Sequence, residues 1–148
     1  MEKSKKELKA LSIVILVFAV VYFAENIIGA ALDGFVIKDI PEGVSFSVAQ
    51  AVYISVLVLS FLFILPDVYI GIKGIKAAKE PVKTKAHITW AKVLMVISII
   101  AVISSVVEAF SSKDLVMDII SIADMTVNAC LYYFYIKHAT VLVKANKQ

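Results

Sequence analysis

The sequence predicts an all-α fold, a bundle of four membrane-spanning helices that forms a single domain. Hydrophobic residues make up 61% of the chain, and the mean hydropathy is +0.91; soluble domains are only about 45–50% apolar. Lysine avoids the interior of the apolar stretches, and the chain contains no arginine. Each stretch approaches the ~20 residues that cross a ~30 Å hydrocarbon core. The four spans are 8–32, 47–72, 93–110 and 115–136, all within one integral membrane domain over residues 1–148.

The first span is preceded by Ser4-Lys5-Lys6-Glu7, which has the Ser-x-x-Glu form of a capping box. We therefore expect the first helix to begin at this sequence and to enter the membrane without a break. It should end near Asp33. The loop 34–46 that follows contains the turn residues Pro41 and Gly43. Because the loop also keeps several apolar residues, we expect it to lie on the membrane surface or to pack over the bundle.

The second span leads into a basic middle loop. Pro66 lies near the end of this span, where it removes one helical hydrogen bond and predicts a kink. The loop reads Gly71-Ile72-Lys73-Gly74-Ile75-Lys76-Ala77-Ala78-Lys79-Glu80-Pro81, and Trp90 follows it. This stretch resembles a loop that recurs in small bacterial four-span membrane proteins without a known activity. The resemblance implies a four-helix inner-membrane topology and supplies no catalytic residues. The lysines expected to face anionic lipid are Lys73, Lys76, Lys79, Lys83 and Lys85.

The third and fourth spans are joined by the short turn 111–114, so we expect them to be antiparallel neighbours. The fourth span ends in Tyr132, Tyr133 and Tyr135, a pattern typical of an aromatic belt at a membrane interface. A weak internal repeat also suggests that the chain consists of two similar helix hairpins. In it, Lys9 and Lys92 each precede a glutamate, Glu25 and Glu108, by the same interval. The same pattern would arise without a repeat if lysine simply precedes every helix that starts inside the cell.

The distribution of lysine predicts the orientation of the chain. Of the 15 basic residues, all but Lys38 and Lys113 lie before or at the very start of the first span, between the second and third, or after the fourth. By the positive-inside rule, both termini and the middle loop are cytoplasmic. This predicts a multi-pass protein of the inner (cytoplasmic) membrane. Because topology accounts for the lysines, we expect lipid and no nucleic acid as a partner.

Acidic residues lie within or beside the spans without a basic companion. A buried carboxylate of this kind must be protonated, bound to an ion or hydrated, because an unpaired charge is costly in the bilayer. Helical periodicity places a polar face along the fourth span and a face of small and polar residues along the third. We expect these faces to converge inside the bundle. The ion- or proton-binding candidates are Asp124, Asn128, Glu25, Glu108 and Asp118, with Asp67 as a separate inner gate.

Other chemistry is weakly supported. His87 and His138 are isolated on the expected cytoplasmic side, and no nucleophile, histidine and acid share one membrane depth. An oxygen-only ligand set suits a hard cation or a proton rather than zinc. Cys130 is the single cysteine, so it cannot form an intramolecular disulfide. We therefore expect neither an enzyme nor a bound cofactor.

Two functions remain. The first is an accessory, assembly or protective (immunity-like) factor that acts through helix and loop contacts, which the short length and basic middle loop favour. The second is a proton- or cation-handling transporter or channel subunit that uses the acidic residues inside the bundle. Four spans make a narrow pore. The second function therefore predicts a homo-oligomer or another membrane protein as partner.

Overall fold

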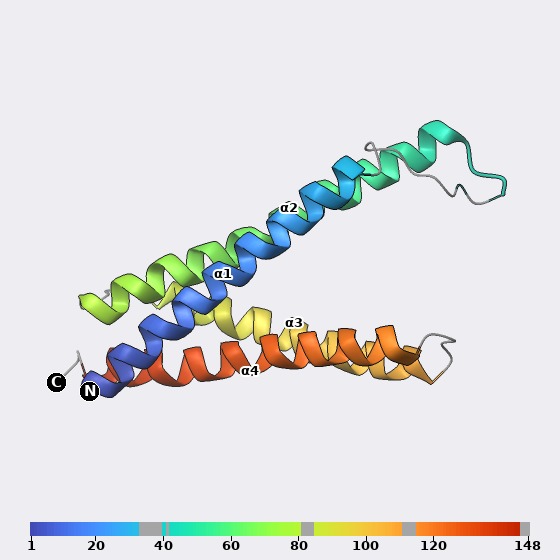
Figure 1. The fold of residues 1–148 in the computed structure, drawn as a ribbon. Helices are drawn as coiled ribbons and strands as arrows, with labels where there is room; N and C mark the ends of the chain where they lie inside the picture. Colours follow the sequence, from blue (N-terminus) through green and yellow to red (C-terminus); the bar gives the residue numbers. More distant parts are fainter. Residues whose placement is uncertain (33–39, 41, 81–84, 111–114, 146–148) are drawn as a thin grey trace.

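The computed structural model describes residues 1–32, 40, 42–80, 85–110 and 115–145, and its regular structure there consists of four helices (Figure 1). All four are long and apolar enough to cross a membrane. This confirms the predicted all-α four-helix fold and indicates a multi-pass membrane protein. The helices are α1 (Glu2–Leu32), α2 (Phe46–Lys79), α3 (Ala86–Ala109) and α4 (Leu115–Ala145).

The helix ends differ from the predicted ones. The first helix begins at Glu2 rather than at the Ser4 capping box, and the Lys5 amide donates to the Met1 carbonyl at 3.2 Å. The predicted middle loop is largely helical, because α2 is continuous through Pro66 and ends at Lys79. Alanine and lysine are good helix formers, and lysine near a helix C-terminus is electrostatically favourable. The expectations for 34–39 and for the turn 111–114 lie outside the described residues.

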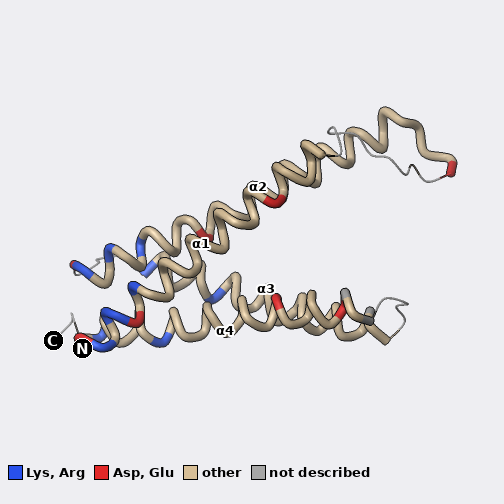
Figure 2. The backbone as a smooth tube through the Cα atoms, viewed as in Figure 1, with Lys and Arg blue, Asp and Glu red and all other residues tan. Residues whose placement is uncertain are grey.

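The four helices form two hairpins. Helix α1 packs along α2, and α3 packs along α4. The start of α1 and the end of α4 lie at one end of the molecule, where the lysines also gather (Figure 2); we call this the lysine-rich end, and the opposite end the turn end. The hairpins meet through contacts of α4 with α1 and α2, and of α2 with α3. They diverge toward the turn end (Figure 1).

The core lies where the hairpins meet. Its best buried side chains come from the half of each helix nearer the lysine-rich end. The other half exposes many large aliphatic side chains, as expected of a surface that faces lipid. We call the buried meeting point the four-helix junction; its central residues are Leu8 and Ser12 of α1, Ile70 and Gly74 of α2, His87 of α3 and Tyr135 of α4.

Small residues on α2 let α1, and at Gly74 also α4 of the other hairpin, approach closely at this end. Gly71 and Gly74 are both buried, and neither has room for a Cβ atom. At Gly74 that atom would lie 2.6 Å from Cε2 of Tyr135. Such residues let helices approach closely. The aromatic-belt prediction is wrong for two of its three tyrosines, because Tyr132 and Tyr135 are buried in the bundle; Tyr133 is 56% exposed.

Candidate functional site

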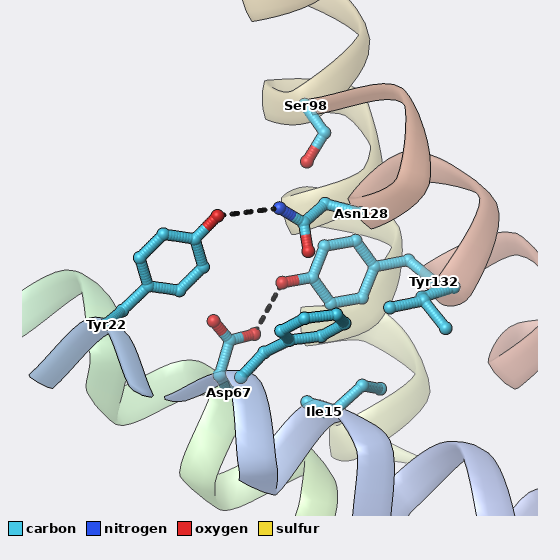
Figure 3. Close-up of a pocket in the computed structure, with 8 residues that line it drawn as sticks. Ile15, Tyr22, Asp67, Ser98, Asn128 and Tyr132 are labelled. Carbon is cyan, nitrogen blue, oxygen red and sulfur yellow. Dashed lines mark hydrogen bonds between the residues drawn. The ribbon is translucent and has the colours of Figure 1, made fainter. Parts of the chain in front are cut away.

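A small polar cavity lies between the two hairpins, at the border of the four-helix junction. All four helices contribute to its wall (Figure 3). The space open to water inside it is about 70 Å³, enough for several water molecules at roughly 10–15 Å³ each. The lining residues are Ile15, Phe18, Tyr22, Asp67, Ser98, Asn128, Leu131 and Tyr132.

Asp67 supplies the carboxylate of the cavity. It follows Pro66 on α2 and is half-buried. The hydroxyl of Tyr132, on α4, donates a hydrogen bond to its Oδ1 atom at 2.5 Å (Figure 3). This bond joins the two hairpins, and it is charge-assisted whenever Asp67 is ionised.

A second hydrogen-bonded group centres on Tyr22 of α1. Its hydroxyl donates to Oδ2 of Asp124, and the side-chain amide of Asn128 donates to the same hydroxyl at 3.5 Å. The amide of Asn26 donates to the backbone carbonyl of Tyr22 at 2.7 Å. Tyr22 therefore links α1 to two positions of α4 that are one helical turn apart.

A wider cleft between α1 and α4 adjoins the cavity. It encloses about 390 Å³ and shares Phe18 and Tyr22 with the cavity. Glu25 and Asp124 stand in its wall, and both are exposed. None of the described residues that line the cavity or the cleft is basic. The electrostatic potential of the whole space therefore favours cations.

The structure brings four of the predicted site residues to one place. Asp67 and Asn128 share the cavity, and Glu25 and Asp124 share the adjoining cleft. Asp67, expected as a separate inner gate, thus lies beside Asn128 in a cavity to which all four helices contribute. Asp118 lines neither space; it is half-buried on α4, and its Oδ2 atom has no hydrogen-bond partner within the described residues.

The other predicted residues lie elsewhere. The side chain of Glu108 and the whole of Lys83 lie outside the described residues. Lys73, Lys76 and Lys79 are on the last turns of α2, and Lys85 immediately precedes α3.

Sequence reasoning missed the roles of two tyrosines. Tyr22 and Tyr132 hold the carboxylates of Asp124 and Asp67. A signal for Tyr132 was present, since it follows Asn128 by four residues and so lies on the same face of α4. Because Tyr132 lies near the lysine-rich end of α4, the sequence pattern favoured a position at the membrane–water interface instead.

The comparisons with known proteins give no family for this chain. No protein-family model, no curated protein and no solved structure matches it. Within the described residues, no three histidine, cysteine, aspartate or glutamate side chains are grouped so as to hold a metal ion. Function must therefore be argued from the cavity and the cleft.

Tyr132→Phe is expected to lower the free energy of unfolding by about 1–3 kcal/mol, because a hydrogen bond to a half-buried carboxylate is lost. Thermal unfolding of the purified protein in detergent measures this change. Tyr133→Phe is the matched control, since Tyr133 is largely exposed. Equal unfolding temperatures for the two variants would show that the Tyr132–Asp67 bond does not stabilise the fold.

Proposed function

We propose that this protein binds a proton or a small cation between its two hairpins and moves it across the membrane. The observation that carries the proposal is the position of Asp67. This carboxylate is half-buried in a membrane-spanning helix, and it faces a cavity whose described lining residues include no basic one. An ionisable residue within a membrane span is expensive and is a functional candidate by default.

The surroundings of Asp67 suit a cation. Glu25 and Asp124 stand in the cleft that leads to the cavity. The aromatic rings of Phe18, Tyr22 and Tyr132 line the cavity, and aromatic faces attract cations. Because the carboxylates do not form a compact ligand cluster, a proton or a monovalent cation fits better than a chelated divalent ion.

In this proposal the cation reaches the site from the turn end. The buried four-helix junction lies on the lysine-rich side of the cavity, and the wider cleft with Glu25 and Asp124 lies on the side where the hairpins diverge (Figure 1). Tyr22 lies on the border between the cleft and the cavity. Transport in this arrangement requires the hairpins to close at the turn end and to part at the junction, so that Asp67 becomes accessible from the other side.

The test is flux into vesicles that contain the purified protein. Proton entry is followed with a pH-sensitive dye under an imposed membrane potential, and sodium or potassium entry is followed in parallel. We expect Asp67→Asn to reduce the flux of the transported cation at least tenfold, because the amide cannot carry a negative charge. Glu42→Gln is the control, since Glu42 is an exposed carboxylate that precedes the start of α2 and does not line the cavity.

Flux at the level of empty vesicles for the wild-type protein would overturn the transport proposal. It would favour the accessory or assembly role instead. For that role, the exposed aliphatic side chains of the diverging halves offer a contact surface to another membrane protein.

A further inference from the structure

A largely apolar groove, separate from the cavity and the cleft, lies on the outside of the bundle where α2 meets α3. It encloses about 300 Å³. Leu62, Leu65 and Pro66 form its apolar part, and Tyr69 and Trp90 form its aromatic part. The α2 residues recur at intervals of three and four positions, so they form one continuous stripe along the helix.

A lysine ends this stripe. The ammonium of Lys73 lies 5.8 Å from the centre of the Tyr69 ring, in the range of a cation–π contact. Lys73 follows Tyr69 by one helical turn toward the lysine-rich end. Within the described part of the chain, Lys73 has no ion pair, so its charge is available to an anion.

We propose that this groove binds an anionic phospholipid. One acyl chain lies against Leu62, Leu65 and Pro66, Tyr69 and Trp90 flank the glycerol region, and the ammonium of Lys73 binds the phosphate of the headgroup. The order along α2, from apolar to aromatic to cationic, follows the order of groups along a phospholipid.

The charge at the end of the stripe favours a lipid, because an ammonium beside an apolar and aromatic surface matches the phosphate of a headgroup. From Leu62 to Lys73 the helix rises about 16 Å, roughly half of a ~30 Å hydrocarbon core. The distance from the acyl-facing residues to the lysine therefore matches one leaflet. The lysines at this end of the molecule (Figure 2) identify the leaflet as the one on the lysine-rich side.

Trp90 provides a fluorescent probe within the groove, because it is the single tryptophan of the chain. The purified protein is placed in phosphatidylcholine vesicles that contain increasing fractions of either brominated phosphatidylglycerol or brominated phosphatidylcholine. Bromine quenches the fluorescence of Trp90 on contact. We expect half-maximal quenching by phosphatidylglycerol at about one fifth of the mole fraction that phosphatidylcholine requires, as one lysine near the surface implies.

Lys73→Gln should abolish this fivefold preference. Lys137→Gln should retain the preference for phosphatidylglycerol. This variant removes the same charge at the same end of the molecule, but Lys137 is exposed on α4. Quenching by brominated phosphatidylcholine and the elution volume in detergent should stay unchanged in both variants, which excludes misfolding. Equal quenching by the two lipids in the wild-type protein, or a preference that persists in Lys73→Gln, would overturn the proposal.

Discussion

Gly74→Leu is expected to destabilise the protein by about 3 kcal/mol or more and to separate the two hairpins. A Cβ atom at this position would meet Ser12 of α1 and would lie 2.6 Å from Cε2 of Tyr135 on α4. Both of those side chains are fully buried, so neither can move into free space. Overpacking of a tight core costs about 1–3 kcal/mol for small additions and more when the backbone must shift. Thermal unfolding in detergent measures the loss of stability.

Gly29→Leu provides the matched control for this variant. Gly29 is also within a membrane-spanning helix, but a Cβ atom there meets nothing within 4 Å. Leucine is a better helix former than glycine, so we expect the stability to be unchanged or slightly raised. If the two variants unfolded at the same temperature, the close approach of α2 to α1 and α4 would not be what holds the hairpins together.

The fold was predictable because the bilayer imposes a simple rule on the sequence. A segment that crosses ~30 Å of hydrocarbon must be an apolar helix of about 20 residues, and all its backbone polar groups must be satisfied within it. The four apolar stretches obey this rule. The helix ends were predicted less well, because hydropathy marks where the hydrocarbon ends and not where the helix ends. The segment from Lys73 to Lys79 is polar and nevertheless helical.

The divergence of the hairpins is a matter of packing, which hydropathy does not describe. The small residues of α2 gather in its last turns, at Gly71, Gly74, Ala77 and Ala78, and all four are buried. The preceding half of α2 has mainly bulky aliphatic and aromatic side chains. Small residues favour close helix contacts and bulky ones do not. The sequence therefore contains a signal for where the hairpins meet, but the angle between them depends on three-dimensional fit.

The candidate site was predicted only in part, again because the packing of helices against one another cannot be read from hydropathy or periodicity. The polar faces of single helices follow from periodicity, which pointed to Asp124 and Asn128 on α4. Which residue of another helix lies opposite depends on the crossing of the hairpins. That crossing places Tyr22 against Asp124 and Asp67 against Tyr132. Neither pairing follows from sequence spacing, since the partners are more than 60 residues apart.

Tyr135→Ala is expected to have the largest effect on stability of the tyrosine variants, about 3–5 kcal/mol. Tyr135 is the largest fully buried side chain within the described residues. Its hydroxyl donates to the carbonyl of Ile70 at 3.0 Å, and its ring meets that of His87 edge-on, with centroids 6.0 Å apart. Truncation would leave a cavity at the four-helix junction and would remove the contacts that this side chain makes with Ile70 of α2 and His87 of α3.

Two further variants separate the causes of this loss. Tyr135→Phe removes only the hydroxyl and should cost about 1 kcal/mol; the remainder then reports the packing of the ring. Tyr133→Ala should cost far less than Tyr135→Ala, because Tyr133 is 56% exposed on the same helix. All three variants are compared by thermal unfolding in one detergent. Similar losses for Tyr133→Ala and Tyr135→Ala would mean that α4 faces the bundle with a different side, and the placement of Asn128 and Tyr132 in the cavity would fail with it.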